Sequence, residues 1–505
     1  MESDLAIRWA LVIAIMGVSI GGVNFGIYML FFIVNTLPER ILAFLFLLLV
    51  TVNTVFNVFG CYYYLRSYGL DKFTPKKITS YPKVAVVMPT RNEDEEMVMR
   101  NMQSITELNY PKSKLNIYLL DNSSKKSPKL KEFCKRIGVK YLYMENPMKL
   151  KSYVMNRFMN MISEEYVAIF DADEYLVDKD FLLETLPFFD KKTGFVQTVK
   201  EFAPGSFFSN AVNVYYLFFY RFMQPVRNLS RSSMFCGSCG VVRRSVVKLV
   251  GGFPSSPTED LAFAFKADVA GRGGVFVSKT YAFGASIESF ETFLSQQWRY
   301  TIGNMWALKD YFSNFAKLTV EKHVHYLSQT FGYAYLSVLY IFYAMLAIIF
   351  IITDISLRSL NSQVLIPEYM KLVAVSYIIS VVLLVVLGGR LYFGSFKSGL
   401  LACFLNFATA VMRTKAMLVG LFGSKANFVM SRQENRTTSL LQVLRASSTE
   451  TLFSAVLFSF SILSFIRKDV ISAFWLFWYS WLFFCTFLFT YATRLNKVSE
   501  KPHTL

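Results

Sequence analysis

Long runs of apolar residues divide the chain into three parts. Six of these runs are long enough to cross a bilayer as a helix. They cover residues 7–34, 41–66, 325–355, 370–388, 450–467 and 469–492. We therefore predict an N-terminal transmembrane hairpin within residues 1–78 and a domain of mixed polarity over 79–320. A C-terminal transmembrane region, with the features of a channel, is predicted over 321–505.

One further apolar stretch, residues 395–422, contains Arg413 and Lys415. Two charges in the middle of a bilayer are costly, so this stretch is predicted to be an interfacial helix and not a span. Six crossings then place both termini and the 79–320 domain on one side of the membrane. Lysine and arginine are concentrated in the segments that this topology leaves on that side, which indicates the cytoplasm. The sequence therefore predicts a multi-pass integral membrane protein whose termini and central domain are cytoplasmic.

The composition supports a membrane location. Of the 505 residues, 54% are hydrophobic and only 17% are charged, whereas soluble domains carry about 25% charged residues. The mean hydropathy is +0.37. The net charge of +18 fits cytoplasmic loops and anionic lipid headgroups. No compact basic module stands apart, so membrane lipid is the expected partner and nucleic acid is not. The six cysteines are scattered and predict no disulfide framework.

Strands and helices alternate in the central domain. Apolar runs predict strands at 84–89, 115–120, 139–144 and 165–171, with helices between them. This order is typical of an α/β domain with a mainly parallel sheet and right-handed crossovers. Asp121 and Asp171 each follow a strand directly. Since ligands bind at the carboxyl ends of parallel strands, both aspartates are expected at one ligand-binding edge.

Asp171 and Asp173 form a D-x-D pair at the end of a short buried strand. Two carboxylates this close repel each other unless a cation lies between them. A hard divalent ion such as Mg²⁺ or Mn²⁺, which itself binds a diphosphate, suits these oxygen ligands. Taken alone, the pair could equally be an acidic loop before a helix.

Eight short motifs follow one another between residues 84 and 303. They are Pro89–Glu93 (PTRNE), Asp121, Lys151–Asn156 (K-x-x-x-x-N), Asp171–Asp173 (D-x-D), Val196–Thr198 (VQT), Phe235–Ser238 (FCGS), Thr258–Asp260 (TED) and Gln296–Tyr300 (QQWRY). In identity and order they resemble the motifs of family 2 inverting glycosyltransferases, of the processive, membrane-embedded type that includes cellulose, chitin and hyaluronan synthases. The resemblance implies a GT-A domain inserted between transmembrane helices.

The resemblance also implies roles for individual residues. The nucleotide-sugar donor would be bound by Thr90, Asn92, Glu93, Asp121, Lys151, Asp171, Gln296 and Arg299. Asp173, with Asp171, would hold Mg²⁺ or Mn²⁺. Phe235, Cys236, Gly237 and Tyr300 would contact the acceptor, and Thr258, Glu259 and Asp260 would form the catalytic motif. A gating loop within 424–437 would include Phe428, Ser431 and Arg432, although three positions of its F-x-V-T-x-K pattern differ here.

Chemistry explains why such residues are needed. The departing diphosphate needs positive charge, which a metal ion and Lys151 could supply, although Lys149 leaves that assignment open. The attacking hydroxyl must lose its proton to a positioned carboxylate, for which Asp260 is the candidate. Direct attack by the acceptor inverts the anomeric centre. Thr258 could also cap the helix that follows it.

Helical spacing places Gln296, Arg299, Tyr300 and Gly303 on one face of the last motif. In the family the position of Tyr300 is usually tryptophan, so acceptor preference is expected to differ. The leading hypothesis is a synthase that adds sugars from a UDP-sugar to a β-linked polysaccharide and exports it. A single transfer to a lipid carrier or glycolipid is the alternative, and an inactive transporter or channel is the third. A GDP-linked mannosyl donor also remains open.

Overall fold

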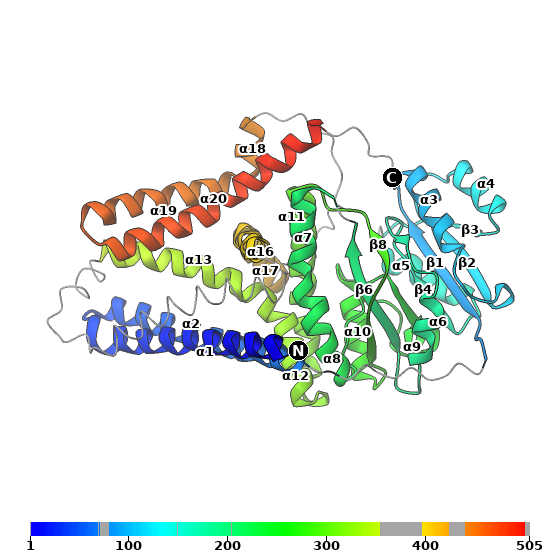
Figure 1. Ribbon diagram of the computed structural model, residues 1–505, viewed down its shortest axis with the longest axis horizontal. Coiled ribbons are helices and arrows are strands. Elements are labelled where there is room, and N and C mark those ends of the chain that lie inside the picture. The colour runs from blue at the N-terminus through cyan, green and yellow to red at the C-terminus, as the bar shows by residue number, and fades with distance from the viewer. Residues whose placement is uncertain are drawn as a thin grey trace.

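The computed structural model describes residues 2–68, 70, 80–148, 150–203, 205–353, 396–423 and 440–499. A mixed α/β domain lies at one end of the molecule, and long apolar helices extend away from it (Figure 1). The predicted span at 370–388 lies outside the described residues. The predicted gating loop at 424–437, with Phe428, Ser431 and Arg432, lies outside them as well.

The central domain is built on one eight-stranded sheet. In chain order its strands are β1 (Val84–Thr90), β2 (Leu115–Asp121), β3 (Lys140–Tyr143), β4 (Tyr166–Ile169), β5 (Tyr175–Leu176), β6 (Phe195–Phe202), β7 (Gly240–Arg243) and β8 (Gly274–Gly284). Their spatial order is β3-β2-β1-β4-β7-β6-β8-β5. The first four strands are parallel, as predicted. β7 runs antiparallel to both of its neighbours, so the whole sheet is mixed.

Both faces of the sheet are covered by helices, which explains why all seven residues of β1 are buried. Val86 and Met88 enter one core with α3 and α4, while Ala85 and Val87 enter a second core with α5 and α10. The helices of this domain are α3 (Glu95–Ile105), α4 (Pro128–Arg136), α5 (Lys151–Met161), α6 (Phe181–Thr185), α9 (Arg244–Leu249) and α10 (Glu259–Val269), with 3-10 turns at Lys112–Lys114 and Leu186–Phe188. A strand buried on both faces is expected to be a continuous apolar run, and this one is.

Five helices of the described residues are long and apolar enough to cross a membrane. They are α1 (Glu2–Tyr28), α2 (Leu37–Arg66), α13 (Phe331–Ile352), α19 (Ser448–Ile466) and α20 (Val470–Ser499). α1 and α2 form the predicted hairpin, in which Thr36 and Glu39 make a capping box at the start of α2. The predicted span from 325 is wrong at its start, because α12 (Val320–Gln329) ends before α13 begins.

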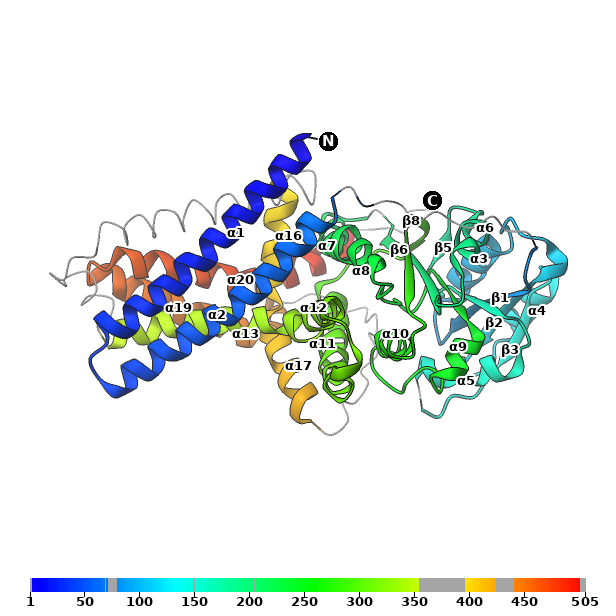
Figure 2. The same cartoon turned by 90° about the horizontal axis from the view of Figure 1, so that it is seen from below.

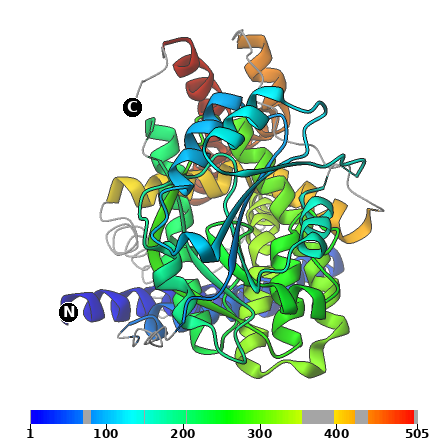
Figure 3. The same cartoon turned by 90° about the vertical axis from the view of Figure 1, so that its right-hand side faces the viewer.

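A further group of helices packs against the sheet domain, the apolar helices or one another. It contains α7 (Phe207–Phe218), α8 (Gln224–Leu229), α11 (Phe290–Ser313), α16 (Phe396–Ala408), α17 (Ala410–Phe422) and α18 (Leu440–Ala446), with π-helical turns at Met29–Ile33 and Phe219–Met223 and a 3-10 turn at Phe315–Lys317 elsewhere in the chain. α16 and α17 run across the ends of the long helices (Figure 2), and they protrude on opposite sides of the molecule (Figure 3). This crosswise course fits the interfacial position predicted for 395–422. The stretch is two helices, however, because it breaks at Thr409.

Candidate active site

The loops after β1 and β2 are tied together at the edge where the parallel strands end. The Thr90 hydroxyl donates to Glu93 Oε2 at 2.7 Å. Asn92 has a left-handed backbone conformation, with φ of 59°, and its N–H donates to Ser123 Oγ at 2.9 Å. Asn92 Oδ1 accepts the Ser124 N–H at 2.9 Å. The side chains of Thr90, Asn92 and Glu93 therefore shape this loop pair.

Asp121 lies where the sequence predicts, at the end of β2, and is fully buried. Its Oδ1 accepts the Ser123 N–H at 3.0 Å, and its Oδ2 accepts the hydroxyl of Tyr141. Both carboxylate oxygens thus have partners within the protein. In this structure the Asp121 carboxylate stabilises its own loop, whereas the sequence predicted that it binds the nucleotide.

Asp171 is held between two lysines. Lys151, the first residue of α5, donates to Asp171 Oδ1, while Lys200 on β6 donates to Oδ2 at 2.8 Å. Burial acts to raise the pKa of Asp171, but the two ammonium groups outweigh it and hold the pKa well below its usual range. Asp171 is therefore a fixed anion, with Lys151 on the side predicted for the diphosphate.

Asp173 is in a different electrostatic state from Asp171. Burial raises the pKa of Asp173 to about 7, and the negative charge of Asp171 adds to this effect. A carboxylate that is costly to ionise in this position is one that a cation would stabilise. Among the described residues, no group of three His, Cys, Asp or Glu side chains could hold a metal ion. Asp171 and Asp173 therefore fit a divalent ion only if it takes further ligands from elsewhere, such as diphosphate oxygens.

The F-C-G-S turn is fixed by the V-Q-T strand. Gln197 is fully buried, accepts the Cys236 N–H at 2.7 Å and donates to the carbonyl of Ser238 at 2.9 Å. Gly237 has φ of +81°, a conformation that glycine adopts without strain. Its carbonyl accepts the Lys151 ammonium at 3.0 Å. The turn is thereby placed beside the D-x-D loop.

Phe235 does not face the site. It is 1% exposed and packs edge-to-face against Phe195 and Phe263 in the domain core. Its predicted contact with the acceptor is therefore wrong for this structure. The partly exposed residues of the turn are Cys236 and Gly237.

The T-E-D motif begins α10 and approaches the same turn. A Cβ on Gly237 would lie 3.2 Å from Asp260 Oδ2, so this carboxylate is packed against the glycine. Oδ1 of Asp260 accepts the Leu261 N–H at 2.8 Å. The predicted cap by Thr258 is wrong, because its side chain makes no capping hydrogen bond; its buried hydroxyl lacks a partner among the described residues.

Asn156, the last residue of K-x-x-x-x-N, holds the loop that precedes T-E-D. It donates to the Phe253 carbonyl at 2.9 Å and accepts the Phe253 N–H at 2.8 Å. Lys151 and Asn156 lie on the same helix, α5. One helix therefore positions both the D-x-D loop and the loop that leads to Asp260.

Three charged residues lie where α10 and α11 meet. Burial raises the pKa of Glu259 to about 7, assisted by the charge of Asp260. Burial also raises the pKa of Asp260, although Arg299 and Lys151 oppose the shift. Arg299 opposes the rise in the pKa of both carboxylates, so its positive charge lies near T-E-D. Its buried Nε has no partner in the described part of the chain.

α11 contacts T-E-D through Gly303. A Cβ at this position would lie 2.1 Å from Thr258 Oγ1, so only glycine allows the two helices to come this close. Arg299 lies over the Tyr300 ring, 5.5 Å from its centroid. Gln296 accepts the hydroxyl of Tyr216 at 3.2 Å. The helix face predicted from spacing therefore does point into the protein, toward T-E-D and α7.

The predicted site residues leave out several residues that complete the site. These are Glu174, Lys200, Ser238, Gln297 and Arg413. Lys200 gives only a weak signal in the sequence, since it lies in the partly exposed second half of β6 beside another charged residue, Glu201. Ser238 and Gln297 lie within the F-C-G-S and QQWRY motifs, although no role was predicted for either. Glu174 and Arg413 give no pattern in the sequence, since their contacts come from segments far apart in the chain.

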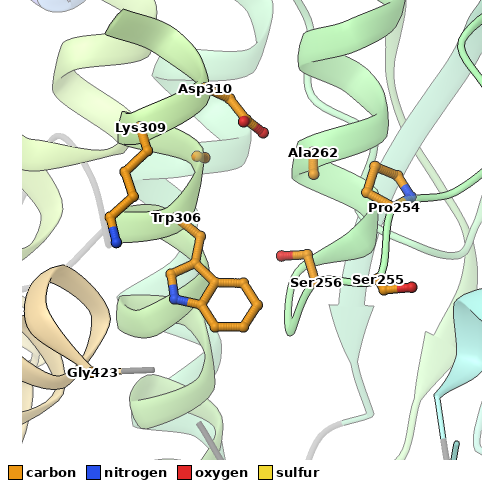
Figure 4. Close-up of a pocket in the computed structure, with 9 residues that line it drawn as sticks. Pro254, Ser255, Ser256, Ala262, Trp306, Lys309, Asp310 and Gly423 are labelled. Atoms are coloured by element: carbon orange, nitrogen blue, oxygen red, sulfur yellow. The ribbon is translucent and has the colours of Figure 1, made fainter. Parts of the chain in front are cut away.

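A pocket of about 310 Å³ lies on another side of the T-E-D helix. Ser256 and Pro254 from the loop before T-E-D face Trp306 and Asp310 of α11 across it (Figure 4). Gly423, at the end of α17, completes the wall. None of the predicted site residues lines this pocket, so it is separate from the charged site.

The comparison with protein families agrees with this geometry. Residues 82–303 match the model of the glycosyltransferase-like family 2, the stretch that contains all eight motifs. Among curated relatives, the chain is 31% identical over 232 residues to the cellulose synthase catalytic subunit (UDP-forming) of Pseudomonas fluorescens strain SBW25. It is 29% identical over 253 residues to cellulose synthase 2 of Novacetimonas hansenii. The central region of the chain is therefore a glycosyltransferase-like family 2 domain.

These matches cover only part of each sequence. The two alignments cover 44% and 48% of this chain, but only 31% and 16% of the relatives. The chain thus spans less than a third of the length of these curated relatives. Among solved structures, a mannosyltransferase from Pyrobaculum calidifontis in complex with GDP-Man and Mn²⁺ is 16% identical, with a TM-score of 0.46 over 71% of this chain and 97% of that one.

Proposed function

We propose that this protein is a membrane glycosyltransferase that transfers a sugar from a nucleotide-sugar, with inversion, to the end of a growing β-linked polysaccharide. A UDP-sugar is the proposed donor. The similarity of the 82–303 domain to cellulose synthases supports repeated transfer. The apolar helices beside the domain support a product that passes into or through the membrane, with the domain and termini on the cytoplasmic side.

One observation carries the proposal. Lys151 bonds both Asp171 and the Gly237 carbonyl, and Asp260 packs against Gly237. The D-x-D pair, the turn and the candidate base are therefore adjacent, although the sequence separates them by almost 90 residues. Donor-binding and acceptor-activating groups must be this close for direct transfer.

Asp260 acts as general base in this proposal. Its Oδ1 is occupied by the Leu261 N–H, so Oδ2 is the oxygen that takes the proton from the attacking hydroxyl. Burial raises the pKa of Asp260, which makes its carboxylate a stronger base. The oxygen of the acceptor then bonds to the anomeric carbon as the bond to the diphosphate breaks.

Positive side chains stabilise the negative charge of the departing diphosphate. Lys151 and Arg299 both oppose the rise in the pKa of Asp260, so their positive charges lie near the candidate base. A divalent ion held by Asp173 with Asp171 would supply further positive charge to the leaving group. Tyr300 offers a ring and a hydroxyl for the acceptor sugar.

The test is nucleotide release by the purified protein with a panel of UDP- and GDP-sugars in Mg²⁺ or Mn²⁺. Release with a UDP-sugar, together with a ladder of labelled products, is the expected result. One discrete glycolipid would instead show single transfer to a lipid acceptor. The absence of both nucleotide release and sugar transfer with every donor in the panel would overturn the proposal.

A further inference from the structure

The ammonium group of Lys200 connects two parts of the site that come from distant segments. It donates to Asp171 Oδ2 at 2.8 Å and to Ser238 Oγ in the F-C-G-S turn at 2.7 Å. It also lies 3.1 Å from Glu174 Oε1. A lysine ammonium has three N–H donors, and here each has an acceptor within the protein. Lys200 therefore acts on its neighbours and has no donor left for a substrate.

Lys151 makes a parallel connection from the opposite side. It bonds the other carboxylate oxygen of Asp171 and the carbonyl of Gly237. Each oxygen of Asp171 is thus held by a lysine, and each lysine also bonds the F-C-G-S turn. We name Lys151, Lys200 and Asp171 the two-lysine clamp.

Glu174 closes the arrangement into a ring. Its Oε2 accepts the Asp171 N–H at 2.8 Å, and its Oε1 accepts the Ser238 hydroxyl at 2.5 Å. Glu174 is fully buried, and a buried carboxylate needs a nearby positive charge to remain stable. Lys200 provides that charge. The D-x-D loop cannot shift relative to the F-C-G-S turn without breaking one of these bonds.

We propose that Lys200 is a positioning residue that couples the metal-diphosphate side of the site to the acceptor side, by holding the F-C-G-S turn at a fixed place beside Asp171. The assignment of these two sides to a nucleotide-sugar donor and a sugar acceptor rests on the proposed function. The mechanical coupling does not, because it is a property of the hydrogen-bond ring. Binding of a nucleotide and metal at the D-x-D loop therefore alters the turn through Lys200.

Cys236 provides a direct reporter of the turn. It is partly exposed, while Cys61, Cys134, Cys239 and Cys485 are buried. Burial raises the pKa of the Cys236 thiol to about 12, so its modification by N-ethylmaleimide is slow and an increase is easy to detect. Fragmentation of the modified peptide, which also contains Cys239, gives the rate for Cys236 alone. This readout requires no catalysis.

The experiment compares Lys200→Met, Lys200→Arg and Lys279→Met in the full-length purified protein. Lys279 is the matched control, since it also pairs with two carboxylates, Asp178 at 2.8 Å and Glu184 at 2.6 Å, away from the site. In Lys200→Met we expect Cys236 to react at least about threefold faster, because local opening of the turn becomes easier. The change in rate that UDP with Mn²⁺ causes in the natural protein should disappear. Lys279→Met should behave as the natural protein does, and Lys200→Arg should keep the Cys236 rate closer to that of the natural protein than Lys200→Met does.

Kinetics separate positioning from direct binding. In Lys200→Met, kcat should fall by about tenfold or more, whereas affinity for UDP with Mn²⁺ should change by less than about threefold. Equal losses of kcat and of affinity for UDP would show that Lys200 binds the nucleotide-sugar directly, and would overturn the proposal. An unchanged Cys236 rate would also overturn it. If Lys200→Met does not fold, Ser238→Ala removes the bond from Lys200 to the turn, together with the bond from Ser238 to Glu174. It should raise the Cys236 rate in the same direction, and an unchanged rate would again overturn the proposal.

Discussion

Two polar layers lie one on each side of α11, and they differ in the kind of side chain that they contain. On the sheet side, Asp171, Asp173, Glu259 and Asp260 are set against lysines and Arg299. On the membrane side, Gln297 is fully buried and accepts Arg413 at 2.7 Å and the hydroxyl of Tyr333. The first layer is rich in charge, and the second consists of rings and amides around one cation.

Under the proposed function, the contrast suits two different ligands. A metal-diphosphate needs opposing charges in fixed places, and the sheet side provides them at strand ends. A sugar chain is neutral and rich in hydroxyls, for which rings and amides are suitable partners. Because α11 carries Arg299 toward one layer and Gln297 toward the other, a change on this helix should affect both. Each prediction below alters one of the two layers.

The largest effect is expected for Asp260→Asn. Loss of the general base should lower kcat by about 10²–10⁴-fold, while affinity for UDP with Mn²⁺ should stay nearly the same. Nucleotide release and calorimetry measure the two quantities. Asp310→Asn, a change in the separate pocket of Figure 4, serves as the control. Normal turnover in Asp260→Asn would show that another group takes the proton.

Asp173→Ala should weaken metal-dependent binding within the charged layer. Loss of one carboxylate from a site with few protein ligands should raise the Kd of UDP in Mn²⁺ by about 10–100-fold. In EDTA the variant and the natural protein should bind UDP equally. Asp178→Ala, which removes a partner of Lys279, should have no effect on either value. Equal Kd values in Mn²⁺ would exclude Asp173 as a ligand.

The layer on the membrane side of α11 can be tested through the thermal stability of the protein. Gln297→Ala would remove the acceptor of Arg413 and Tyr333 and leave them buried without it, at an expected cost of about 1–3 kcal/mol. Arg413→Met should cost less or be neutral, since Arg413 has no ion pair among the described residues and its Nε has no partner there. A hydrophobic replacement of a buried charge is often tolerated. Thermal unfolding in detergent measures the order, and a lower Tm for Arg413→Met than for Gln297→Ala would contradict it.

Sequence reasoning succeeds where a side chain's place follows from its own element. Asp121 and Asp171 lie at strand ends because apolar runs stop there, and Gly303 faces T-E-D because helical spacing requires it. It fails for Thr258 and Phe235, whose motif identity does not show which way the side chain turns. It also misses Lys200, whose three partners come from two separate segments. Contacts of this kind depend on the packed sheet and cannot be obtained from spacing.

The smallest effect concerns pH and compares stability with activity. In the folded protein the pKa of Glu259 is raised to about 7, whereas an unfolded glutamate titrates at about 4.3. Between these values the folded state binds the extra proton, so in EDTA stability should fall as pH rises from about 5 to 7. Turnover should change in the opposite sense, because the base is active only when it is ionised. Glu259→Gln should reduce the slope of stability against pH but not abolish it, since the pKa of Asp173 is also raised to about 7. A slope that Glu259→Gln leaves unchanged would mean that Glu259 ionises normally, and that the charge of the sheet-side layer is balanced around Asp173 alone.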